Sequence, residues 1–126
     1  MPRFIRVRIC RREWIVELNQ TGTASRVYRS CPLEGEAEVW GEEVYFSVPV
    51  EHDPKDPLSH YVCRGEVGFW PPGRAICLFF GATPESPEGT IRPDGPVIVI
   101  GRVVSDFADY HKVREGERAR VERKEG

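Results

Sequence analysis

The sequence has few amide side chains, few lysines and no long apolar segment. Asn19 and Gln20 are its only amides, Met1 is its only methionine, and arginines far outnumber lysines. A charge-rich chain with few thermolabile residues is typical of thermophile proteins, although a GC-rich genome produces the same excess of arginine. The apolar runs are much shorter than the roughly 20 residues of a membrane-spanning helix, so we expect no membrane partner.

The chain also lacks a strong net charge and an N-terminal targeting signal. A formal charge of -2 gives no general basic field to attract nucleic acid. The arginines of residues 3–12 are matched by an acidic strand over residues 34–38, and cross-strand pairing explains both without a nucleic-acid partner. Residues 1–3 lead directly into a predicted strand rather than a signal peptide, so we expect a cytoplasmic protein.

The four cysteines have no short spacing between any two of them. Cys10, Cys31, Cys63 and Cys77 therefore match neither a zinc knuckle nor a redox CxxC motif. Four reduced, partly buried thiols are one interpretation, and one or two structural disulfides of the kind found in hyperthermophiles are the other. No flanking signature supports a catalytic cysteine.

Alternating apolar and polar residues predict a mostly β fold, and the length suits a single domain over residues 1–126. Apolar positions in residues 21–31 recur with helical spacing; Thr21 or Thr23 can cap this helix and Pro32 ends it. A short helix is expected over residues 106–112. Many short strands without βαβ alternation predict a closed β-barrel that one main helix and one short helix cover. The strands are expected at residues 4–10, 13–18, 34–40, 44–48, 66–70, 75–80, 96–104 and 118–123.

The hairpin over residues 65–81 is the most distinctive part of the chain. Pro72 and Gly73 suit the two central positions of a type II turn, in which glycine takes a positive φ. Pro71 cannot donate a ladder hydrogen bond, so the first strand should end at Trp70. Both faces of the hairpin are apolar, which predicts that other segments cover it on both sides.

Four distinctive motifs follow one another along the chain: WGEEVYF at residues 40–46, GEVGFWPPG at 65–73, FGATP at 80–84 and PVIVIGRV at 96–103. Together they resemble the small prokaryotic cyclophilin-like family, and a fifth motif, Thr21-Gly22-Thr23-Ala24, fits as well. The resemblance covers nearly the whole chain and implies a cyclophilin-like β-barrel with helices over its openings. It implies no particular activity, because the function of this family is largely unassigned.

Proline isomerisation is the first enzymatic candidate that the resemblance raises. Cyclophilins use an arginine beside an aromatic pocket, within a Phe-His-Arg run. This sequence has no such run, and His52, His60 and His111 lie in predicted loops or turns. Because fold does not imply function, we favour a non-catalytic binding protein; a divergent peptidyl-prolyl isomerase or an amide-processing enzyme is the alternative.

The strand pattern predicts a ligand site on the outer face of the barrel. Tyr45, Trp70 and Phe79 are expected to share this face, with Arg74 and Arg102 near the strand ends. An aromatic floor beside arginine suits an anionic or amide-bearing small molecule or peptide. Two alternatives remain: these aromatics form a second small core under the helix, or an outer apolar patch forms a homodimer interface.

Histidines and carboxylates also gather in the loop over residues 51–60. Both groups suit zinc or manganese, but their spacing matches no known ligand motif. We interpret the segment as a solvated, charged loop and predict neither a metal nor another cofactor. The residues concerned are Glu51, His52, Asp53, Asp56 and His60.

Overall fold

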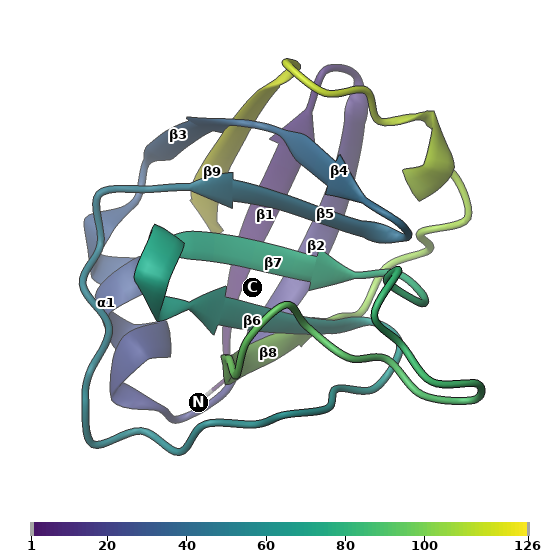
Figure 1. The fold of residues 1–126 in the computed structure, drawn as a ribbon. Coiled ribbons are helices and arrows are strands. Elements are labelled where there is room, and N and C mark those ends of the chain that lie inside the picture. Colours follow the sequence, from purple (N-terminus) through teal and green to yellow (C-terminus); the bar gives the residue numbers. More distant parts are fainter. Residues whose placement is uncertain (1, 126) are drawn as a thin grey trace.

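The computed structural model describes residues 2–125 and is mostly β (Figure 1). The single α-helix in this part of the chain is α1 (Gly22–Ser30), and its nine residues are far fewer than a membrane crossing requires. Two short 3-10 turns are present: η1 (Pro71–Gly73) connects the two strands of the hairpin, and η2 (Tyr110–Lys112) lies in the segment before the last strand. The strands are β1 (Arg3–Ile9), β2 (Arg12–Leu18), β3 (Leu33–Glu36), β4 (Glu38–Trp40), β5 (Glu43–Ser47), β6 (Glu66–Trp70), β7 (Ala75–Phe79), β8 (Ile98–Val103) and β9 (Arg118–Lys124).

All nine strands belong to one antiparallel sheet in the order β3-β9-β1-β2-β8-β6-β7-β5-β4. In Figure 1, β1, β2 and β9 run steeply across the view, whereas β5, β6 and β7 run nearly level. The sheet therefore folds over on itself, and its two halves share an apolar interior. A register shift between Val67 and Gly68 lies in the β6–β8 ladder, close to this bend; such irregularities increase the local bending of a strand.

The prediction of a closed β-barrel is wrong. The hydrogen-bonded order begins at β3 and ends at β4, and no ladder among residues 2–125 joins these two terminal strands. The reason is covalent: β3 and β4 are consecutive parts of one extended segment, separated only by Ala37. They lie end to end rather than side by side. One segment thus supplies both edges of the sheet, which approach each other without pairing.

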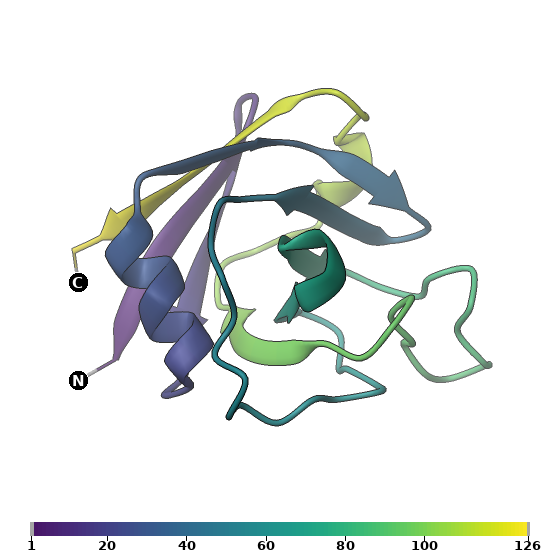
Figure 2. The same cartoon turned by 60° about the vertical axis from the view of Figure 1, so that its left-hand side comes forward.

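The prediction of the main helix is confirmed, and the prediction of a second, short helix is wrong. Thr21 caps α1 by accepting a hydrogen bond from the Ala24 backbone N–H, and Thr23, Ala24 and Val27 are buried. Figure 2 shows α1 along one end of the folded sheet. Near residue 110 only the 3-10 turn η2 forms. The segment is held against the core as irregular turns, and the Tyr110 ring stacks on Phe80 with 4.9 Å between the ring centroids.

The hairpin turn also differs from its prediction. Residues 71–73 form the 3-10 turn η1, and the positive φ, 48°, falls on Arg74 rather than on Gly73. Two consecutive prolines hold φ near the helical value, so the chain continues as one tight turn before it reverses. The Arg74 N–H donates to the Pro71 carbonyl at 3.1 Å and closes this turn.

Buried apolar side chains form two separate clusters. The main core fills the interior of the folded sheet, and its largest fully buried members include Trp14, Phe46 and Phe69. A smaller outer cluster lies on the opposite face of β5, β6 and β7. It contains Val62, Ala75, Cys77, Phe79, Ile91 and Val97, with Tyr45, Trp70 and Val99 packed against it. The prediction that the hairpin is covered on both faces is thus confirmed.

Candidate functional site

The candidate site is built on the outer face of β4, β5, β7 and β6. Side chains alternate along a strand, so Glu43 and Tyr45 of β5 point to the same face. Across the ladders, Glu43 lies opposite Trp40 and Tyr45 lies opposite Cys77. The next partner in that row, Gly68, has no side chain. The space over Gly68 is filled: a Cβ atom there would lie 2.9 Å from Val97 and 3.1 Å from Phe79. The hollow lies beside these side chains, next to Glu43, Tyr45 and Cys77.

Two long loops cover this face. The loop after β5 and the loop after β7 are tied together by backbone bridges between Ser59 and Val97 and between Val62 and Ile91. A cavity of about 160 Å³ lies between the sheet and the second of these loops, which supplies Pro93, Asp94 and Val97. It is lined by Trp40, Glu43, Tyr45, Trp70, Cys77, Pro93, Asp94 and Val97.

Glu43 is the unusual residue of the cavity. The residue is buried, with 5% of its surface exposed. Its side chain takes part in none of the ion pairs found among residues 2–125. Burial raises the pKa of the Glu43 carboxyl to about 7, the Cys77 thiol opposes this shift by hydrogen bonding, and the Asp94 charge adds to it. A buried carboxylate without a cation is costly, so the fold retains this group at a cost in stability.

Cys77 is unsuited to nucleophilic chemistry. Burial and then the Glu43 charge raise the pKa of its thiol well above the ordinary value. Reactive cysteines have the opposite character, with a lowered pKa and solvent access. All four cysteines are free in the structure, and Cys77 contributes to the cavity a buried thiol beside Glu43.

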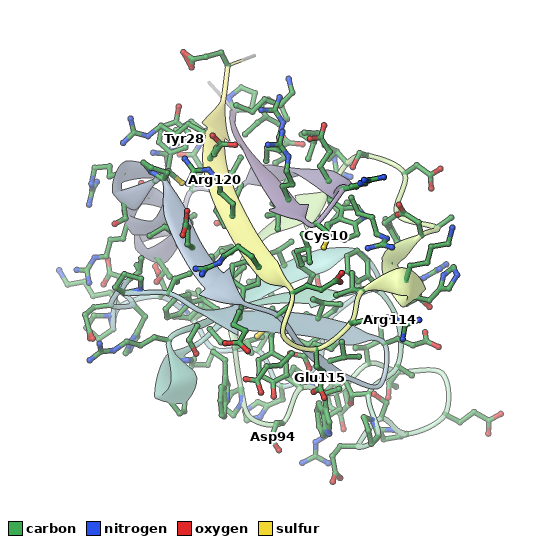
Figure 3. All side chains as sticks on the ribbon, turned by 90° about the horizontal axis from the view of Figure 1, so that it is seen from above. Cys10, Tyr28, Asp94, Arg114, Glu115 and Arg120 are labelled. Atoms are coloured by element: carbon green, nitrogen blue, oxygen red, sulfur yellow. The ribbon has the colours of Figure 1, made fainter. Side chains whose placement is uncertain are left out.

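Three aromatic rings, from Trp40, Tyr45 and Trp70, border the same cavity. Burial raises the pKa of the Tyr45 hydroxyl, and the charges of Glu38 and Glu43 add to this shift. The surroundings of the ring are therefore acidic. In Figure 3, Asp94 projects on the side of the molecule away from β9 and Arg120. The cavity thus combines aromatic faces with two carboxyl groups, and no arginine or lysine lines it.

The Trp70 indole is held in place by two glycines. A Cβ atom at position 73 would lie 2.7 Å from a carbon of the indole, and one at position 95 would lie 3.1 Å from its Nε1 atom. Both distances are shorter than a normal van der Waals contact, so only glycine lets the backbone approach the ring so closely. The indole is consequently fixed as one wall of the cavity.

Comparison with known proteins identifies the family. Residues 3–122 match the family model described as cyclophilin-like. The chain belongs to the cyclophilin-like family. The resemblance seen in the four sequence motifs is therefore confirmed. No curated protein matches the chain.

A solved structure from the archaeon Archaeoglobus fulgidus is similar to this member of the family. It is the solution structure of a hypothetical protein, with 36% sequence identity and a TM-score of 0.84. The match covers 98% of this chain and 95% of the archaeal one. The similarity extends over both halves of the sheet. Because the archaeal protein is described only as hypothetical, the similarity assigns no activity to this chain.

The structure separates the five residues that the sequence analysis selected. Tyr45 and Trp70 line the cavity, and Phe79 lies fully buried beneath it in the outer cluster. Arg74 and Arg102 are elsewhere on the surface: their side chains pair with Glu51 at 2.8 Å and with Glu17 at 3.4 Å.

Sequence reasoning missed Trp40, Glu43 and Asp94. The signal for Glu43 was present, since a residue two positions before Tyr45 on one strand must share its face. For Asp94 no signal exists, because a loop brings it to the cavity.

The acidic loop over residues 51–60 contributes to the fold. The Asp56 carboxylate accepts hydrogen bonds from the backbone N–H groups of Gly22 and Thr23, at 3.1 and 2.7 Å. It also accepts a hydrogen bond from the Thr23 hydroxyl at 2.6 Å. A carboxylate at a helix N-terminus stabilises the helix, and Asp56 thereby fastens the loop to α1. Within residues 2–125, no three His, Cys, Asp or Glu side chains are arranged to hold a metal ion.

Proposed function

We propose that the protein binds the cationic head of a small organic ligand in the cavity, without catalysis. The observation that carries this proposal is the Glu43 carboxyl, buried and without an ion-pair partner, beside the rings of Trp40, Tyr45 and Trp70. Cations bind to aromatic faces with about 0.5–2 kcal/mol per favourable contact, and substituted ammonium groups are the common ligands of such cages. A bound cation would also supply the charge that Glu43 lacks.

The size of the cavity supports a compact head group. Its volume is about 160 Å³, and an apolar cavity of roughly 150 Å³ holds a molecule the size of benzene. A trimethylammonium group is comparable in size and has an apolar surface that suits the rings. A strongly hydrated ion such as Na⁺ would gain little from aromatic walls.

The second candidate is an amide-binding or amide-processing protein, and one observation favours it. With a pKa of about 7, a protonated Glu43 can donate a hydrogen bond to an amide carbonyl, and a carboxyl with that pKa suits general acid–base catalysis. The arginine that a proline isomerase would require is missing from the cavity lining. The two candidates predict opposite pH dependence, because a cation binds the ionised carboxylate and an amide binds the neutral acid.

The test is a titration with tetramethylammonium followed by the indole N–H signals in NMR spectra. We expect saturable shifts for Trp40 and Trp70, whereas Trp14, fully buried in the main core, should not respond. Because Glu43 has a pKa of about 7, affinity should rise about tenfold between pH 6 and pH 8. Asp94, Cys77 and Tyr45 also face the site; Asp94 is an exposed carboxylate, and burial raises the pKa values of Cys77 and Tyr45.

Matched controls make this test decisive. Glu43→Gln should weaken tetramethylammonium binding at pH 8 by about tenfold, equivalent to about 1.4 kcal/mol. Glu88→Gln removes the same charge from an exposed loop position and should leave affinity unchanged. Equal binding of neutral tert-butanol would refute cation recognition. Acetamide binding that weakens as pH rises would establish the amide candidate instead.

A further inference from the structure

A second hollow adjoins the cation site on the other side of Trp70. Its volume is about 420 Å³, and its lining is mostly apolar: Leu58, Trp70, Gly95 and four prolines take part, and the polar side chains are those of His52 and Asp56. Leu58 is the most exposed large hydrophobic side chain among residues 2–125, with 53% of its surface accessible. An exposed leucine beside four proline rings and an indole forms an apolar surface that a ligand can cover.

Two features join this hollow to the cavity. Trp70 is the one residue that lines both the cavity and the hollow. Close approach of the backbone at Gly73 and Gly95 fixes its indole. The segment over residues 93–97 borders both as well: Pro93 and Asp94 line the cavity, and Gly95 and Pro96 line the hollow. A molecule with its head in the cavity therefore meets the hollow as soon as it passes the edge of Trp70.

The two hollows differ in chemistry. The cavity holds Glu43 and Asp94. The larger hollow has one imidazole, His52, and one carboxylate, Asp56, which is already engaged by the N-terminus of α1 through Gly22 and Thr23. Charge is thus available at one end of the combined site and apolar surface at the other. The ligand that complements both ends is amphipathic, with a cationic head and an apolar tail.

We infer that the ligand of this protein is a small amphipathic cation whose apolar tail crosses Trp70 and lies against Leu58 and the proline rings. This inference rests on the cation site proposed above. Volume supports a small molecule as the occupant: small-molecule sites commonly measure about 300–1,000 Å³. The cavity alone, at about 160 Å³, is below that range, and the cavity together with the 420 Å³ hollow falls within it.

The test is a calorimetric series of trimethylammonium ions with methyl, butyl and hexyl tails. A methylene removed fully from water strengthens binding about fourfold, and in a half-open groove we expect about twofold for each. Hexyltrimethylammonium should therefore bind at least about tenfold more tightly than tetramethylammonium.

Two variants locate the tail. Leu58→Ser should remove most of the gain from the hexyl tail and leave tetramethylammonium affinity unchanged. Val104→Ser is the matched control, because Val104 is also exposed, at 42%, and borders neither hollow. It should change neither ligand's affinity.

The outcomes separate this inference from the proposed function. If tetramethylammonium itself does not bind, the cation site is refuted and the tail site falls with it. If tetramethylammonium binds and longer tails add nothing, or Leu58→Ser has no effect on the gain, only the tail site is refuted. The last ligand tested is a short peptide that carries trimethyllysine. If it binds about tenfold more tightly than hexyltrimethylammonium, the occupant is a protein segment, and the small-molecule assignment is overturned.

Discussion

The two apolar clusters of this protein use the same strands in different ways. The main core unites both halves of the sheet and α1, and its buried members are apolar. The outer cluster is much smaller, is covered by loops, and adjoins a cavity with a buried carboxyl group. The inward faces of the strands thus form the main core, and the outward faces carry the outer cluster and the polar groups of the cavity.

Strand β5 shows this division at adjacent residues. Phe46 points into the main core and is fully buried, whereas Tyr45 points outward, is half-buried and lines the cavity. Both are large aromatic residues, adjacent in one strand. Any difference between their roles must come from the face on which each side chain lies.

The largest effect should come from breaking the main core. Phe46→Ala should lower the free energy of unfolding by about 3–5 kcal/mol, because the cavity left behind adds to the loss of apolar burial. Tyr45→Ala should cost about 1 kcal/mol, since its ring is only partly buried. Guanidinium unfolding of both variants checks the comparison. Equal losses would mean that the outer face is as important for stability as the core.

The second prediction concerns the cost of Glu43 to the fold. Its pKa is raised from 4.5 to about 7 on folding, and each unit corresponds to about 1.4 kcal/mol. The folded state therefore binds the proton more tightly than the unfolded state, and stability falls as pH rises from 4.5 through 7. Glu43→Gln should be about 3 kcal/mol more stable than the natural protein at pH 8 and nearly equal to it at pH 4.

Unfolding in guanidinium at several pH values measures this difference. Glu88→Gln is the control and should follow the natural protein at every pH. A Glu43→Gln variant that is less stable at pH 8 would mean that the carboxylate has a stabilising partner. A gain in stability with a loss of tetramethylammonium binding would fit a residue retained for function.

Alternation along strands could be read from the sequence, and closure of the sheet could not. The positions of β1, β2 and α1 follow from the period of apolar residues, which is a local property. Whether β3 and β4 pair depends on the path of residues 33–40 between two distant edges. No local pattern encodes that path, and the barrel prediction failed there.

The candidate site divides in the same way. Tyr45 and Trp70 share a face because of strand parity, which the sequence contains. Arg74 and Arg102 were selected because they lie near strand ends. Position along a strand does not fix the direction of a long, exposed side chain, which can pair with a nearby surface carboxylate. These two arginines pair with Glu51 and Glu17 on the surface and do not line the cavity, whereas Asp94 comes to it from a loop of 18 residues, 80–97.

The third prediction sharpens the role of the outer face without touching its lining. Gly73→Ala would put a Cβ atom 2.7 Å from the Trp70 ring, so the indole must move. We expect tetramethylammonium affinity to fall about tenfold, equivalent to about 1.4 kcal/mol, with little change in unfolding. Gly89→Ala is the control: no heavy atom lies within 4 Å of its Cβ position, so its positive φ lowers stability slightly and binding should not change. Unchanged binding in Gly73→Ala would show that the position of Trp70 is unimportant.

The smallest effects should come from the two arginines that the sequence analysis selected. The side chains of the Arg74–Glu51 pair are 60% and 64% exposed, and that of Arg102 is 69% exposed. Ion pairs in such positions contribute about 0–1 kcal/mol. Arg74→Ala and Arg102→Ala should therefore change unfolding by less than about 1 kcal/mol and tetramethylammonium affinity by less than about twofold. If the natural protein binds a carboxylate such as acetate and either variant abolishes this binding, arginine is the binding group. The outer face would then recognise anions, and a cationic ligand would not explain why its cavity is acidic while the main core is apolar.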